Sequence, residues 1–178
     1  GLPLFFAALP MSNDKPTVLI YMHLDGQSVD PSKWDQPDPY KMVLKVPEGD
    51  GFKTVSFDEL NDDINYEWRL FGRSTSDDKS PIVMLLNTID LLKQDGKEIP
   101  FNVKVILDSE EEKSSEPLPK AVKQYRELLE ADFLMIVDGP VHSSGEPTVV
   151  YGCRGITSLS LTTYGPIKPQ HSGHYGNY

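Results

Sequence analysis

The sequence has only one cysteine, Cys153, among its 178 residues. A single thiol excludes an internal disulfide framework and a cysteine-rich zinc site. Long apolar runs are also missing, because none approaches the roughly 20 residues that a membrane-spanning helix needs. The apolar start, residues 1–10, has no basic segment and contains two prolines, so we interpret it as a strand and not as a signal peptide. These absences predict a soluble, cytoplasmic protein.

Basic residues are scarce relative to acidic ones. The chain has 17 Lys and Arg against 27 Asp and Glu, which gives a formal net charge of −10. Nucleic acids and anionic membrane surfaces do not attract such a protein, so we expect neither as a partner. The charge is compatible with cations, including metal ions. A hydrophobic content of 38% is enough for a globular core.

Apolar runs predict four strands in the first three quarters of the chain, at residues 4–8, 17–22, 102–107 and 133–137. Apolar residues at helical spacing predict helices at 82–94 and 119–130. The alternation of strands and helices from residue 17 onward favours an α/β fold, with a mostly parallel sheet and helices on both faces. Residues 28–63 show little periodicity and are interpreted as a long connection. No glycine-rich phosphate-binding motif follows any strand, which disfavours a nucleotide-binding domain.

The pattern changes near the end of the chain. Short strands are predicted at 147–151 and 157–164, the second with the alternation of a half-exposed antiparallel strand. We therefore divide the chain into a partial catalytic domain, residues 1–153, and the start of a second, α+β domain, residues 154–178.

Acidic residues and a histidine follow the predicted parallel strands. His23, Glu110 to Glu112 and Asp138 each come after a strand, and Asp77 and Asp78 precede the first helix. Because the carboxyl ends of parallel strands share one edge of a sheet, these side chains are expected to converge. An imidazole and several carboxylates suit Zn²⁺, Mn²⁺ or Co²⁺, and a carboxylate left free could act as general base.

Each of these residues also has a simpler structural interpretation. A histidine beside a strand is often only hydrogen-bonded, and Asp77 could favour a helix start. An acidic run such as 110–112 is commonly a solvated turn, and Asp138 is followed by Gly and Pro, as in many turns. Their agreement on one sheet edge favours a metal site.

Four sequence blocks carry a resemblance to a known family: VLIYMHLDGQ at 18–27, GRSTSDDK at 72–79, DSEEE at 108–112 and HSG at 171–173. In this order they resemble the M20 family of dinuclear-zinc metallopeptidases, which includes carnosinase-like dipeptidases, carboxypeptidases and amino-acid deacylases. The resemblance implies a zinc-peptidase-like catalytic domain followed by a lid domain. It also implies a homodimer formed through the lid in the full-length protein.

The resemblance implies a metal role for four residues. His23 would bind one zinc ion. Glu112 would be a ligand of one metal and Asp138 of the other, and Asp77 would bridge the two. In the family, the peptide bond that corresponds to Asp77–Asp78 is often cis. Two zinc ions about 3.5–4 Å apart would activate a shared water.

Three further residues would act on the reaction. The resemblance implies that Glu111 is the general base, and that Asp25 orients the histidine ligand. His171 would bind the substrate carbonyl from the lid.

The chain also departs from the family pattern. Members are longer and return to the catalytic domain to supply a last histidine ligand, and none of the four histidines here stands in that place. Serines replace glycines that are usual in the blocks, namely Ser74, Ser80, Ser109 and Ser114. We therefore interpret the chain as a fragment of an M20 enzyme that cleaves a dipeptide or a C-terminal residue. Deacylation of N-acyl amino acids, or a non-catalytic metal-binding or assembly role, are the alternatives.

Overall fold

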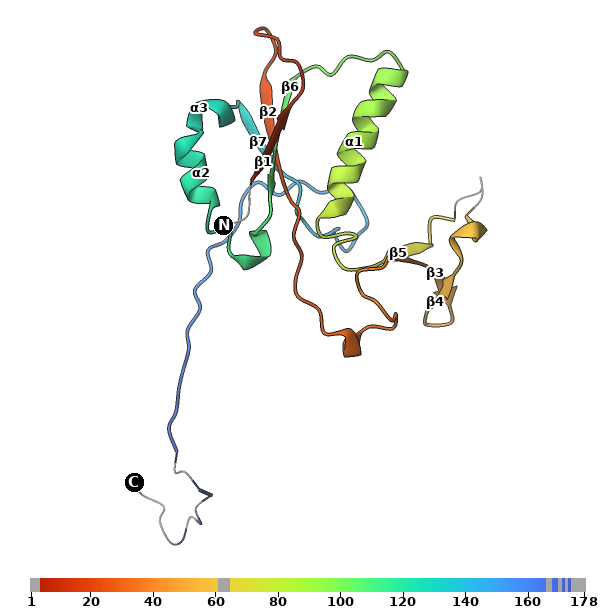
Figure 1. Cartoon of the computed structure of the whole chain (residues 1–178), viewed down its shortest axis with the longest axis vertical. Coiled ribbons are helices and arrows are strands. Elements are labelled where there is room, and N and C mark those ends of the chain that lie inside the picture. The colour runs from red at the N-terminus through yellow and green to blue at the C-terminus, as the bar shows by residue number, and fades with distance from the viewer. Residues whose placement is uncertain (1–3, 61–64, 166–167, 170, 172, 174–178) are drawn as a thin grey trace. The chain divides into compact units, whose positions relative to one another are not determined.

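The computed structural model describes residues 4–60, 65–165, 168, 169, 171 and 173 (Figure 1). The chain divides into two compact units, Gly1–Pro140 and Val141–Tyr178. We describe each unit by itself.

A four-stranded sheet with the order β1-β6-β2-β7 forms the centre of the first unit. Strands β2 (Thr17–His23), β6 (Asn102–Asp108) and β7 (Phe133–Ile136) are parallel, and β1 (Phe5–Ala8) pairs with β6 in antiparallel orientation. The register places His23 opposite Asp108, so β2 and β6 end side by side. The predicted strands and the mostly parallel sheet are confirmed.

Helices cover both faces of this sheet, as predicted (Figure 1). Helix α1 (Lys79–Gln94) lies on one face, and the short helices α2 (Leu118–Gln124) and α3 (Arg126–Leu129) lie on the other. The continuous helix predicted at 119–130 is interrupted at Tyr125. Helix α1 begins earlier than the predicted residue 82, with Asp78 at its N-cap. Pro81 is tolerated there because the first amides of a helix have no partner within the helix.

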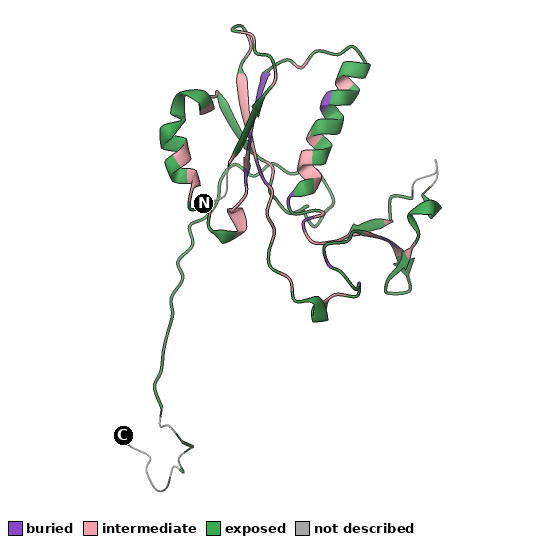
Figure 2. Ribbon diagram, in the orientation of Figure 1, coloured by how far each residue is buried: buried purple, intermediate pink, exposed green. Residues whose placement is uncertain are grey.

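The hydrophobic core lies between the sheet and α1. Ile20, Met22 and Val103 are buried, and Ile82 and Leu85 of α1 pack against them. Alternate residues of each strand point to opposite faces, which explains why the even-numbered residues of β2 form this cluster. Buried residues follow β2 and β6 in Figure 2.

A second sheet was not predicted. Strands β3 (Val43–Glu48), β4 (Gly51–Val55) and β5 (Arg69–Phe71) form an antiparallel sheet with the order β4-β3-β5, in a region whose sequence predicts largely a connection. Leu44 is 2% exposed, and the rings of Phe52 and Phe71 lie 5.4 Å apart. The prediction failed because β3 contains Lys45 and Pro47, which weaken the apolar signal of a strand.

Short 3₁₀ turns complete the first unit: η1 (Pro31–Lys33), η2 (Phe57–Glu59) and η3 (Glu111–Lys113). None of these turns contains a buried residue, so they connect other elements without adding to the core.

The second unit has no β-strand among its described residues. The strands predicted at 147–151 and 157–164 are therefore wrong. Val150, Leu159 and Leu161 are each at least 73% exposed, because an alternating pattern makes a strand only where another strand pairs with it. The division at residue 153 and the lid assignment stay predictions. Within the described residues, no helix has the length and apolar character to cross a membrane.

Candidate metal centre

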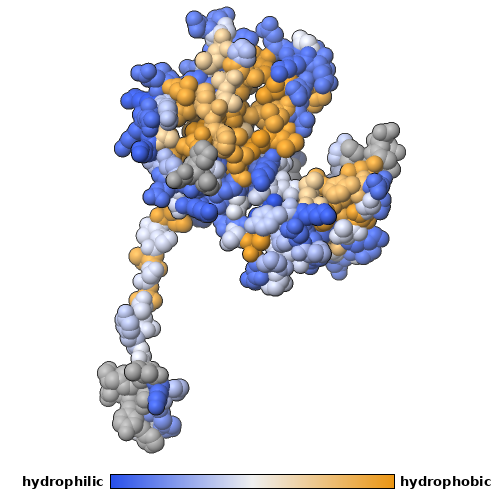
Figure 3. Space-filling view, in the orientation of Figure 1, coloured by the Kyte–Doolittle hydropathy of each residue, from blue (hydrophilic) through white to orange (hydrophobic). Residues whose placement is uncertain are grey.

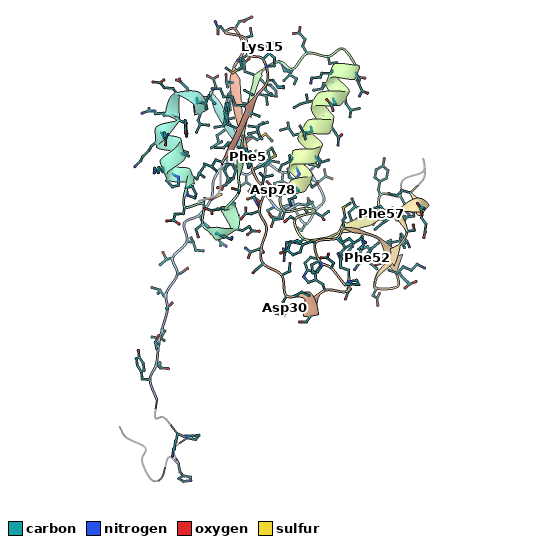
Figure 4. All side chains as sticks on the ribbon, viewed as in Figure 1. Phe5, Lys15, Asp30, Phe52, Phe57 and Asp78 are labelled. Carbon is teal, nitrogen blue, oxygen red and sulfur yellow. The ribbon has the colours of Figure 1, made fainter. Side chains whose placement is uncertain are left out.

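The end of β2 carries the histidine around which the site is built. His23 is 1% exposed and is the last residue of its strand. Its backbone N–H donates to Asp78 Oδ2 at 2.9 Å, and the next amide, that of Leu24, donates to the Asp108 carbonyl at 2.6 Å. These bonds fix the strand end against the start of α1, where Figure 4 labels Asp78, and against the end of β6.

Carboxylates from three other elements converge on the His23 imidazole. Nε2 lies 2.9 Å from Asp77 Oδ1 in the segment before α1, 3.8 Å from Asp138 Oδ1 after β7, and 4.0 Å from Glu111 Oε2 in η3. The expected convergence at the carboxyl edge of the sheet is present.

The geometry offers two sets of metal-binding atoms. His23, Asp77 and Glu112 form one set, and His23, Glu111 and Asp138 the other, with the atoms of each set within 4.8 Å of one another. Both sets use His23, and one imidazole nitrogen binds only one ion. The mixture of one nitrogen with carboxylate oxygens suits Zn²⁺ and also Mn²⁺ or Co²⁺.

Negative charge accumulates in this cluster. Burial raises the pKa of Glu111, and the charges of Asp138 and Glu112 add to that effect against the opposing influence of His23. Burial likewise raises the pKa of Asp138, and it raises the pKa of Asp78 to about 6.

His23 responds to the same charges. Burial lowers its pKa, but Asp138, Asp78 and Asp77 more than offset that effect, so the pKa lies above its ordinary value. Burial and mutual repulsion thus raise the pKa of Glu111, Asp138 and Asp78, and a bound cation would relieve that repulsion.

Asp25 links the histidine to the acidic turn. Its Oδ1 accepts from the Glu111 N–H at 3.1 Å, and its Oδ2 accepts from the Glu112 N–H at 3.2 Å. Oδ1 also lies 3.4 Å from His23 Nδ1, which has no hydrogen-bond partner in the described part of the chain. Asp25 is thus placed where it can orient the imidazole.

The structure adds two acidic residues that the sequence analysis left without a role. Asp78 and Asp108 are each 1% exposed. The Asp108 carboxylate accepts from the Tyr21 hydroxyl at 3.1 Å and from the Glu110 N–H at 2.9 Å, which shapes the turn that carries Glu111. The available signal was a carboxylate directly after a buried strand, since buried carboxylates need partners.

The segment before α1 has two unusual backbone features. The peptide bond between Asp77 and Asp78 is cis, the geometry that the resemblance implies. Ser74 has φ of 62° in this segment, and Ser114 has φ of 76° at the end of η3. Both serines thus have a left-handed conformation, at positions where the resemblance implies glycine.

His171 belongs to the second unit, where its Nδ1 accepts from the Gly173 N–H at 3.1 Å. Its role in substrate binding stays a prediction.

Comparison with known proteins identifies the family. The model of peptidase family M20/M25/M40 matches residues 19–173. The chain belongs to this family. The resemblance drawn from the four sequence blocks is therefore confirmed.

Curated proteins similar to the M20 chain include dipeptidases. The Cys-Gly metallodipeptidase of Schizosaccharomyces pombe is 30% identical over 164 residues, or 91% of this chain and 30% of that protein. The Beta-Ala-His dipeptidase of Mus musculus is 27% identical over 176 residues, or 98% of this chain and 32% of that protein. The chain thus spans about a third of the length of these relatives.

Solved structures agree with the fold. Human carnosine dipeptidase 1 matches with a TM-score of 0.58 and 27% identity, over 77% of this chain and 25% of that one. An M20 family metallo-carboxypeptidase from Sulfolobus solfataricus matches with a TM-score of 0.62 and 29% identity, over 83% of this chain and 28% of that one.

Proposed function

We propose that this chain carries the metal-binding part of a dipeptidase that hydrolyses a peptide bond next to a free carboxylate. The observation that carries the proposal is the convergence of His23, Asp77, Glu111, Glu112 and Asp138 at one sheet edge. Relatives named for Cys-Gly and Beta-Ala-His dipeptides support a dipeptide substrate.

The donor atoms suit Zn²⁺, and the proposal places two ions in the cluster. His23 and Asp138 would hold one ion, Glu112 the other, and Asp77 would be shared. When bound, such ions acidify a water molecule and polarise the scissile carbonyl. Mn²⁺ and Co²⁺ fit the same donors.

Glu111 is the general base in this proposal. Its raised pKa brings it closer to neutrality, where a carboxylate exchanges protons most effectively. It accepts a proton from the attacking water and returns it to the leaving amine. Asp25 supports this role because its carboxylate holds the Glu111 backbone amide.

Glu111 could instead be a metal ligand, since it lies in one of the two sets of binding atoms. Substitution to Gln separates these roles. If Glu111 is the base, Glu111→Gln abolishes dipeptide hydrolysis and leaves the zinc content unchanged. If Glu111 is a ligand, zinc is lost as well. Glu116→Gln is a matched control, because Glu116 is exposed in the same segment.

Two alternatives use the same cluster of metal-binding residues. Deacylation of an N-acyl amino acid breaks the same kind of amide bond, so a comparison of dipeptide and N-acetyl amino-acid turnover tests it. The second alternative is a non-catalytic metal-binding or assembly role. Zinc binding without turnover of either substrate would support that role. For the whole protein, the proposal also includes a homodimer, a cytoplasmic location and a role of His171 in substrate binding.

A further inference from the structure

Gln27 makes two contacts with Glu112 and has no assigned role. It lies on the segment that leaves β2, four residues after His23. Its backbone N–H donates to Glu112 Oε1 at 3.1 Å, and its side-chain Nε2 donates to Glu112 Oε2. Both oxygens of the carboxylate are therefore held by one residue.

The same short segment also contains an acceptor for the amides of the acidic turn. Asp25 accepts hydrogen bonds from the backbone amides of Glu111 and Glu112. Asp25 thus holds the backbone of Glu112 and Gln27 holds its side chain, although these residues are 85 to 87 positions apart in sequence. A glutamate that is otherwise free to change rotamer is confined to one orientation.

This orientation points into the cluster. A Glu112 oxygen lies within 4.8 Å of the ligand atoms of His23 and Asp77. Each carboxylate oxygen has two lone pairs, so the bonds from Gln27 leave acceptor capacity for a cation.

We propose that Gln27 is a positioning residue that fixes the Glu112 carboxylate for divalent-cation binding. The inference rests on the proposed function, because it takes Glu112 to be a metal ligand. Partners that orient a ligand typically change metal affinity by about tenfold to a hundredfold when they are removed. An exposed hydrogen bond with no such role would leave affinity almost unchanged.

The test is zinc affinity of the full 178-residue chain, measured by competition with a chromophoric chelator. Gln27→Met keeps the length of the side chain and removes the amide, and Gln27→Ala removes both. Each should weaken zinc binding by roughly tenfold. Gln124→Ala is the matched control, because Gln124 is exposed and its amide contacts only its neighbour Tyr125. It should bind zinc within about twofold of the wild type.

A double substitution identifies the route of the effect. In a Glu112→Ala background the ligand is gone, so adding Gln27→Met should change zinc affinity by less than about twofold. Thermal unfolding of the metal-free chain should be nearly the same for the wild type and Gln27→Met.

Three results would overturn the inference. Wild-type affinity in both Gln27 variants contradicts it and leaves the proposed function intact. An equal loss in the Glu112→Ala background, or a fall in metal-free stability that accounts for the loss of affinity, shows that Gln27 does not act through Glu112. A wild-type chain that binds no zinc contradicts the proposed function and this inference together.

Discussion

The two faces of the four-stranded sheet are covered very differently. On the α1 face, Met22 is 1% and Val103 3% exposed. On the opposite face, a cavity of about 910 Å³ lies between the sheet and helices α2 and α3, lined by Leu19, Tyr21, Ile106 and Leu134 among others. On that face, Leu134 and Ile136 of β7 are 62% and 61% exposed, whereas Ile106 of β6 is 5% exposed. Apolar side chains gather on the visible surface of this unit in Figure 3.

The comparison shows that the site does not depend on a complete core. Glu111 and Asp138 lie at the end of the poorly covered face, where they also line the cavity. Their positions are set by polar contacts at the strand ends, such as those of Asp25 and Asp108, and by the parallel pairing of β2, β6 and β7. Hydrogen-bonded strand ends can therefore assemble a site beside a face that lacks a full apolar cover.

The largest expected effect on the free energy of unfolding comes from a substitution on the well-covered face, compared with one on the other face. Met22→Ala removes a buried side chain from the α1 face and should lower the free energy of unfolding by about 2–5 kcal/mol. Leu134→Ala on the other face should cost less than about 1 kcal/mol, because Leu134 is 62% exposed. Urea denaturation measures both. Equal losses would mean that the two faces are packed alike.

Zinc binding at the site should stabilise the folded chain. Zinc at a hundred times its dissociation constant should raise the free energy of unfolding by about 2.7 kcal/mol. Asp77→Ala should abolish this gain in thermal unfolding. Asp90→Ala should not, because Asp90 is an exposed aspartate on α1, away from the cluster. A gain that survives in Asp77→Ala would place the metal elsewhere.

The pH dependence of the metal-free chain should reflect Asp78. Its pKa is raised to about 6 in the folded state, mainly by burial, so its contribution to stability is present below about pH 4 and is lost as pH rises through 6. Asp78→Asn removes this loss. With chelator present, the melting temperature of Asp78→Asn minus that of the wild type should increase by roughly 4 °C between pH 4 and pH 7. A constant difference would contradict the assignment.

The smallest effect concerns the contact between the two segments that carry His23 and Asp77. A Cβ on Gly26 would overlap Ser74 Oγ and lie 3.3 Å from Arg73 Cδ. Gly26→Ala should therefore cost about 1 kcal/mol, which Ser74→Ala should relieve in the double variant because it removes the hydroxyl. Gly51→Ala is the control, since its nearest atom would be Glu48 O at 4.0 Å. Without relief in the double variant, the contact would not be the cause.

Much of the first unit could be predicted because its elements are locally encoded. The apolar runs of β2, β6 and β7 and the stripe of α1 are visible in sequence, and the shared edge of parallel strands then predicts the convergence of His23, Glu111 and Asp138. The same reasoning included Asp77 and Glu112, and the resemblance assigned a separate role to each member of the set.

The remainder depends on tertiary contacts that the sequence pattern does not reveal. Lys45 resembles an exposed residue, yet it is 5% exposed, with Nζ 4.5 Å from the centre of the Phe71 ring and 3.6 Å from Asp35. Such a contact appears only once β3 and β5 pair. The hydrogen bonds between His23 and Asp78 and between Gln27 and Glu112 likewise join residues that are far apart in sequence. The alternation at 157–164 predicts a strand but not the partner that it needs.

The most direct measurement is the zinc content of the purified chain after loading and dialysis, by elemental mass spectrometry. A site built from His23, Asp77, Glu112 and Asp138 predicts at least about one zinc ion per chain, and about two if both ions bind without further ligands. The zinc should be lost in Asp77→Ala and retained in Asp90→Ala. A wild-type chain without zinc, or an Asp77→Ala chain that keeps it, would contradict the account.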